Sequence, residues 1–114
     1  MPQPDHLFLE HMLQAFDRIE ELLNRTVRED FDRDWVVQDA LIRELEIIGE
    51  AAGRVSPDLS RSYPEVPWKE ITGLRHKLIH DYFTVDLGIV WTTATRDAAE
   101  VRPHIEKALE ALKE

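Results

Sequence analysis

The sequence contains no cysteine, which excludes disulfide bonds and thiolate metal sites. It also lacks any apolar run near the ~18 residues of a membrane-spanning helix. Its first residues show neither the basic segment nor the apolar segment of a secretion signal. From these absences we predict a cytoplasmic protein that makes no contact with a membrane.

Positive charge is scarce as well, because 14 Lys and Arg face 23 Asp and Glu, for a formal net charge of −9. This balance argues against a broad electrostatic affinity for nucleic acid, which requires Lys and Arg to neutralise phosphates. A focused anion site is still compatible with it. The stretch 68–80 is mildly basic, with Lys69, Arg75 and Lys77 against Glu70.

Segments with the period of a strand are also missing, whereas apolar residues recur at helical steps of three and four. The chain of 114 residues fits one domain, spanning 1–114. The pattern predicts helices over 5–25, from about Phe31 or Asp34 to Val55, and from the N-cap Asp86 towards the C-terminus. Ser56-Pro57 predicts a short extra helical turn over 57–62. The expected fold is an all-α, up-down four-helix bundle.

Helix boundaries follow from local signals. Thr26 and Glu29 have the spacing of a capping box and predict the start of a new helical segment. Pro67 predicts the start of a third helix, which we expect to end near Tyr82 or Phe83. Pro103 predicts a kink or interruption of the last helix near 101–102.

The second predicted helix has a wide apolar arc, and Gly49 in its middle permits a close backbone approach. A dimer interface is one use for that approach. The charged face of this helix is expected to be solvated, with the role of Glu50 open. The three tryptophans, Trp35, Trp68 and Trp91, are expected in the core rather than stacked on bases.

The most reactive stretch runs from Arg75 to Tyr82. On a continuous helix, Arg75 and His80 point about 140° apart, because each residue turns the helix by about 100°. Both reach one substrate only if the long Arg75 side chain bends around the helix, if the last turn is distorted, or if a second copy of the chain contributes across a symmetric interface. We expect the last two together.

Other interpretations follow from spacing alone. His80 suits a helix C-terminus, where it bonds to the last carbonyls. Arg75 suits a surface ion pair with Glu70 or Asp81, and Tyr82 suits a packing residue. His76 and His80 supply only two metal ligands, so we predict no metal site.

The motif Arg75-His76-Lys77-Leu78-Ile79-His80-Asp81-Tyr82 resembles the Arg-x4-His-x-Tyr pattern of the HepT-like toxins of the HEPN superfamily. Flanking segments resemble that family in the same order, and the likeness covers nearly the whole chain. The matching segments are Ile47-Ile48-Gly49-Glu50-Ala51, Val66-Pro67-Trp68-Lys69-Glu70-Ile71, Gly73-Leu74-Arg75 and His80-Asp81-Tyr82-Phe83.

The resemblance implies a helical homodimer in which two motifs meet in one cleft and cleave RNA, such as tRNA, without a metal or cofactor. It implies the toxin of a toxin–antitoxin pair. The antitoxin partner is then a minimal nucleotidyltransferase, which silences the toxin by attaching AMP to the motif tyrosine. Tyr82 stands at that position.

In this interpretation His80 is the general base, since an ordinary histidine pKa of ~6.5 leaves a neutral fraction at cytoplasmic pH. Arg75 stabilises the charge on phosphorus. His76, Lys77 and Tyr82 bind the substrate or assist. The expected products are a 2′,3′-cyclic phosphate and a 5′-hydroxyl.

Two other functions stay open. The first is a non-catalytic helical dimer that binds a nucleotidyltransferase partner or a nucleotide, and the acidic balance favours it. The second is a metal-binding helical bundle. The sequence fixes neither the RNA target nor which imidazole is the base.

Overall fold

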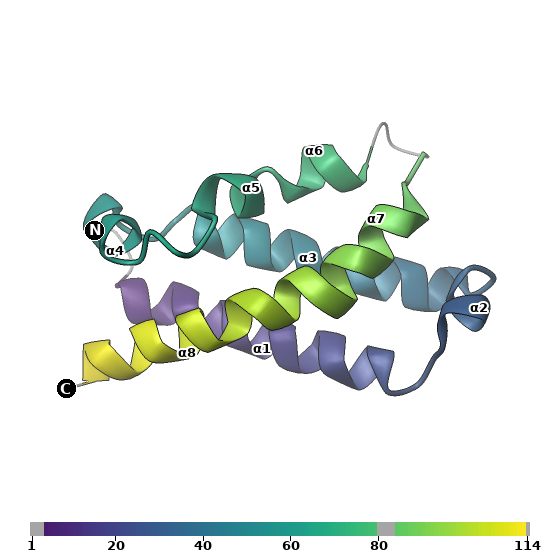
Figure 1. Ribbon diagram of the computed structural model, residues 1–114, viewed down its shortest axis with the longest axis horizontal. Helices are drawn as coiled ribbons and strands as arrows, with labels where there is room; N and C mark the ends of the chain where they lie inside the picture. The colour runs from purple at the N-terminus through teal and green to yellow at the C-terminus, as the bar shows by residue number, and fades with distance from the viewer. Residues whose placement is uncertain (1–3, 80–83, 114) are drawn as a thin grey trace.

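The chain forms an all-α bundle in a computed structural model that describes residues 4–79 and 84–113 (Figure 1). Within those residues the only β-structure is an isolated bridge between Ile79 and Val85. The elements are α1 (Asp5–Leu23), α2 (Arg28–Phe31), α3 (Trp35–Ala52), α4 (Pro57–Ser62), α5 (Trp68–Thr72), α6 (Leu74–Leu78), α7 (Leu87–Thr92), a π-helical segment η1 (Thr93–Asp97) and α8 (Ala98–Lys113).

The long elements run alternately up and down the molecule (Figure 1). Helix α1 packs against α3 and α8, while α5 and α6 lie along α3 and take the place of the third long helix. Helix α1 begins and α8 ends at the same end of the bundle (Figure 1). The predicted all-helical bundle is therefore confirmed, with two short helices where one longer helix was expected.

One apolar core fills the space between these helices. Helix α1 buries Phe8, Leu9, Met12, Ala15, Phe16 and Ile19. Opposite it, α3 buries Leu41, Ile42, Leu45, Ile48, Ala51 and Ala52. Burying one large apolar side chain contributes roughly 1.5–3 kcal/mol. Because one face of α3 packs into this core, the opposite face of α3 points away from it.

Two predicted helix starts differ in outcome. The side chain of Ser56 caps α4 by accepting from the Leu59 amide at 3.2 Å, as expected. The capping box at Thr26 does not form, because α2 begins one residue later with Val27 as its N-cap. No side chain caps α2, and the Thr26 hydroxyl donates to the Val27 carbonyl.

The prediction of one helix from Pro67 to Tyr82 or Phe83 is wrong. Gly73 separates α5 from α6, and α6 ends at Leu78. Ile79 has extended dihedral angles (φ −118°, ψ 113°). The bridge to Val85 and a hydrogen bond from the Asp86 amide to the Leu78 carbonyl (3.1 Å) hold this end in place. Here the backbone pairing of Ile79 with Val85 ends the helix, although the periodicity of the sequence predicted a longer one.

The expected interruption at 101–102 is also wrong, because α8 runs continuously through Pro103. The irregular winding lies earlier, in the π-helical segment Thr93–Asp97. Next to the proline, the Arg102 guanidinium binds the Asp17 and Glu20 carboxylates of α1. These ion pairs connect α8 to α1 close to the backbone hydrogen bond that Pro103 cannot donate.

The tryptophans divide into two groups. Trp68 packs against the core and donates its ring N–H to the Tyr63 carbonyl at 3.0 Å, and Trp91 lies 5.1 Å from the Phe31 ring. Trp35 is 69% exposed, so its predicted core position is wrong. It is the first residue of α3, whose buried residues begin only at Leu41.

None of the helices in the described ranges 4–79 and 84–113 is long and apolar enough to cross a membrane.

Candidate functional site

Gly49 sets the distance between α3 and the motif-bearing helices. A Cβ atom on Gly49 would lie 2.9 Å from the carbonyl oxygen of Ile71 and 3.9 Å from the Leu74 Cβ. Real Cβ atoms essentially never come so close to a backbone oxygen. The predicted close approach is therefore real, and its partner is α5 of the same chain.

Helix α6 presents its charged side chains on two different sides of the molecule. Leu74 and Leu78 are buried, which fixes the rotation of the helix. Arg75 and His76 are exposed on one side, and Lys77 is exposed on the other. This division follows from helical geometry, since residues two apart lie about 200° apart around the axis.

Arg75 and His76 line an open hollow of about 760 Å³ between α1, α3 and α6, which we call the basic hollow. Its charged or titratable members are His11 from α1, Arg43, Glu46 and Glu50 from α3, Arg54 from the turn after α3, and Arg75 and His76 from α6. Three arginines therefore face two glutamates. The Glu50 carboxylate pairs with Arg54 at 3.0 Å.

Ion pairing distinguishes two of the three arginines of the basic hollow from the other arginines of the chain. Eight of the ten arginines lie within 4.0 Å of an Asp or Glu oxygen: Arg18, Arg25, Arg28, Arg33, Arg54, Arg61, Arg96 and Arg102. In residues 4–79 and 84–113, Arg43 and Arg75 are the two without such a partner. Both line the basic hollow.

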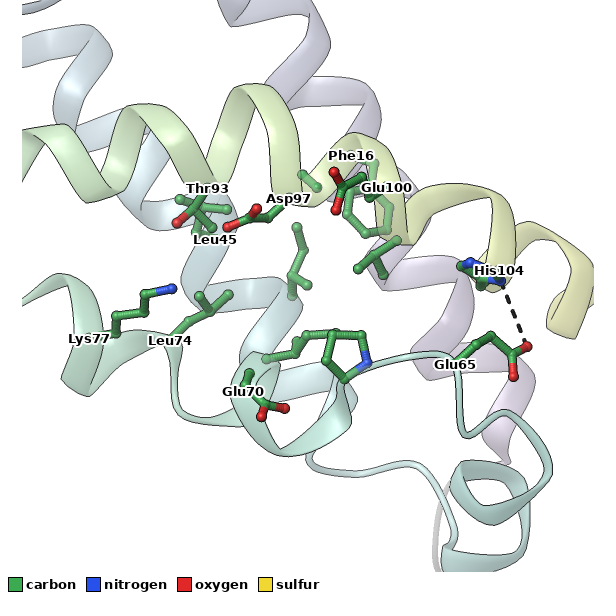
Figure 2. Close-up of a pocket in the computed structure, with 15 residues that line it drawn as sticks. Phe16, Leu45, Glu65, Glu70, Leu74, Lys77, Thr93, Asp97, Glu100 and His104 are labelled. Carbon is green, nitrogen blue, oxygen red and sulfur yellow. Dashed lines mark ion pairs between the residues drawn. The ribbon is translucent and has the colours of Figure 1, made fainter.

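Lys77 lies on the other side of α6, in a cavity of about 430 Å³ that we call the acidic cavity (Figure 2). Apolar side chains including Phe16, Leu45 and Leu74 line it. Four carboxylates surround it, from Glu65, Glu70, Asp97 and Glu100. The only cations there are Lys77 and, when protonated, His104, which lies 3.7 Å from Glu65.

The acidic cavity also contains a buried hydroxyl. Thr93 is 4% exposed, and its hydroxyl has no hydrogen-bond partner among residues 4–79 and 84–113. Lys77 additionally borders a shallow depression with Arg28 and Arg96. Both guanidiniums are already ion-paired, to Asp32 and Asp97 respectively, so that depression offers no unpaired arginine.

The structure thus brings together two of the predicted site residues, Arg75 and His76, and places Lys77 apart from them. His80 and Tyr82 lie outside the described residues. The helix ends two residues before His80, so the 140° angle expected between Arg75 and His80 on a continuous helix does not apply. In the described ranges, no three His, Asp or Glu side chains converge as metal ligands would.

Sequence reasoning missed His11, Arg43 and Arg54. The sequence does contain a pattern that groups the two arginines. Spacings of four, three and four residues, typical of one helix face, separate Arg43, Ile47, Glu50 and Arg54. That face was interpreted as simply solvated. Only the position of α6 shows that it forms a wall of the basic hollow.

Comparison with known proteins gives a consistent result. A family model described as "Ribonuclease HepT-like" matches residues 12–108. A "Probable ribonuclease HepT" from Thermococcus cleftensis is 42% identical, over 88% of this chain and 91% of its own length. A "Putative RNase" from Caldanaerobacter subterraneus is 38% identical, over 96% and 95%. Another from Methanocaldococcus jannaschii is 38% identical over 100% and 99%. No solved structure matches the chain significantly.

Proposed function

The chain belongs to the HepT-like ribonuclease family, and from this premise we propose that it is a metal-independent endoribonuclease that acts as a homodimer. The observation that carries the proposal is the environment of Arg75. This side chain is exposed, faces the basic hollow and has no carboxylate partner in the described part of the chain. An arginine in that state is available to bind a phosphate.

The proposed reaction is an internal transesterification of RNA. His80 takes the proton of a ribose 2′-hydroxyl, and the oxygen attacks the adjacent phosphorus. Arg75 stabilises the negative charge that builds up on the phosphorane oxygens, because a guanidinium is always charged and binds two oxygens at once. The bond to the 5′-oxygen breaks, and that oxygen takes a proton from the His76 imidazolium. The products are a 2′,3′-cyclic phosphate and a 5′-hydroxyl.

The geometry of α6 supports this division of roles. His76 follows Arg75 directly and lines the same hollow, so both can contact one phosphodiester. Lys77 faces the acidic cavity, and we assign it no contact with the phosphate bound by its own chain. A second chain in the homodimer supplies another Arg75 and His80 to a shared cleft.

We further propose a toxin–antitoxin setting, from the family resemblance of the motif. The partner is a minimal nucleotidyltransferase that attaches AMP to the Tyr82 hydroxyl. The added phosphate would bring negative charge and bulk into the motif and compete for Arg75. Intact-mass measurement after incubation with the partner and ATP should show one added adenylyl group, and Tyr82→Phe should show none.

The test of the catalytic proposal is cleavage of total RNA and tRNA by the purified, unmodified protein in EDTA. Wild type should cut and leave 2′,3′-cyclic phosphate ends. His80→Ala and Arg75→Ala should not cut, although circular dichroism and sedimentation show them folded and in the same oligomeric state as wild type. Full cleavage by either folded variant would reject the role given to that residue.

One observation favours a second candidate, a non-catalytic helical dimer that binds a nucleotidyltransferase or a nucleotide. The chain is strongly acidic, and most of its arginines are already occupied by its own carboxylates. Expression of the chain alone separates the two functions. A ribonuclease toxin should stop growth in a manner that depends on Arg75, whereas a binding module should leave growth unchanged.

A further inference from the structure

Arg43 is a cation that the proposed reaction does not use. It lies on α3, is exposed and has no acidic partner within the described ranges. The chain contains 23 Asp and Glu, and eight of its ten arginines form an ion pair with one of them. The two without such a partner in residues 4–79 and 84–113, Arg43 and Arg75, come from different helices and line the same hollow.

The rest of the basic hollow is consistent with an extended anion. His11 lines it from α1, with its ring 6.4 Å from that of Phe8 in an edge-on arrangement. Arg54 follows the end of α3 by two residues, and the helix rises about 13 Å from Arg43 to its last residue, Ala52. This length exceeds what a single phosphate group occupies. The hollow is therefore suited to a chain of phosphates.

The walls of the hollow carry few competing charges. Glu50 is occupied by Arg54, which leaves Glu46 as the other carboxylate near Arg43 and Arg75. With histidines neutral, the three arginines and two glutamates give the hollow one net positive charge in a chain whose net charge is −9. Local attraction for phosphate is thus present where the overall charge opposes it.

We propose that Arg43 is a second phosphate-binding residue, which holds single-stranded RNA through a phosphate next to the one contacted by Arg75. This inference rests on the proposed function for its ligand. It assigns Arg43 a positioning role: the residue fixes the RNA along α3, with His11 beside it, so that the reacting phosphodiester stays at α6.

The test is the salt dependence of binding to a single-stranded RNA oligonucleotide with 2′-O-methyl groups throughout. That ligand lacks the attacking hydroxyl and cannot be cleaved by the proposed route, so binding is measured apart from catalysis. Each phosphate neutralised on a single strand contributes about 0.7 to the slope of log affinity against log salt. Arg43→Ala should therefore lower the slope by about 0.7 and weaken binding about fourfold at roughly 0.15 M salt.

Two variants serve as controls. Arg43→Lys keeps the charge and should restore most of the slope. Arg33→Ala removes an exposed arginine of another part of the surface that is paired with Asp30 at 3.4 Å, and it should leave the slope unchanged. The oligomeric state of every variant is measured by sedimentation at the concentrations used.

The outcomes separate the two proposals. If Arg43→Ala keeps the wild-type slope, or wild type does not bind the oligonucleotide, the second phosphate site is refuted even if wild type cleaves RNA. A weaker dimer with an unchanged slope also refutes it, because Arg43 would then contact the second copy. If the slope falls as expected but wild type leaves unmodified RNA intact, the phosphate site stands and the ribonuclease proposal fails.

Discussion

The two sides of α6 differ in how their charges are compensated. On one side, the basic hollow contains Arg43 and Arg75, which lack acidic partners among the described residues. On the other, the acidic cavity has one lysine against four carboxylates (Figure 2). The anion site that we propose therefore rests on two arginines without an acidic partner in the described ranges, rather than on an accumulation of cations.

The same comparison separates Arg75 from Lys77, two neighbouring cations of one motif. Sequence alone gives them similar roles, because both are basic and lie two residues apart. In the fold, Lys77 lines a cavity whose charged lining includes four carboxylates. Position around the helix therefore puts the two cations in surroundings of opposite charge.

The largest expected effect is the loss of activity on replacing Arg75. Arg75→Ala should lower kcat/KM for RNA cleavage by about 10²–10³-fold, the range seen when one group that stabilises transition-state charge is removed. Lys77→Ala is the matched control and should change kcat/KM by less than about twofold, because exposed charges near carboxylates contribute little. Equal losses in both folded variants would remove the distinction between the two sides.

The second prediction concerns the close contact between α3 and α5, which positions α6. Gly49→Ala places a methyl group against the Ile71 carbonyl, and overpacking of this kind costs about 1–3 kcal/mol, offset by up to about 1 kcal/mol of helix propensity. The free energy of unfolding in urea, measured at fixed protein concentration, should fall accordingly. The variant should also cleave RNA more slowly, because α5 and α6 must shift.

Gly53→Ala is the control for that prediction, since its Cβ would meet its nearest atom at 3.5 Å, an ordinary contact. It should be neutral or slightly stabilising. If Gly49→Ala is as stable as Gly53→Ala, the close approach does not set the position of the motif.

The smallest effect concerns Glu50. Glu50→Gln removes the partner of Arg54 and one negative charge from the basic hollow, so affinity for the 2′-O-methyl oligonucleotide should rise about two- to threefold. Glu70→Gln removes the same charge from the acidic cavity and should leave affinity nearly unchanged. Similar gains in both variants would indicate a general charge effect without preference for either side.

Periodicity predicted the parts of the fold that depend on a single buried stripe. Helices α1 and α3 lie close to their expected bounds, and the N-caps Ser56 and Asp86 accept the expected amide hydrogen bonds. Gly49 makes the expected close contact. These features are local, or they need only one apolar face.

The errors lie where distant contacts override the local pattern. The third helix stops at Leu78 because Ile79 pairs with Val85, which no periodicity reveals. The turn around Pro103 stays helical while Arg102 binds α1 across the bundle. For the same reason, the sequence did not single out Arg43. The role proposed for Arg43 depends on α6, which approaches the Arg43 face of α3 only in the fold.

The most direct test of the account is to ask which side of α6 meets RNA, using the histidines as reporters in an NMR titration with the 2′-O-methyl oligonucleotide. His11 and His76 line the basic hollow, and His104 lies in the acidic cavity. The account predicts that the imidazole signals of His11 and His76 shift as the oligonucleotide is added, and that these shifts give the same dissociation constant as the binding measurement. The signals of His104 should not shift. Shifts confined to His104 would contradict it.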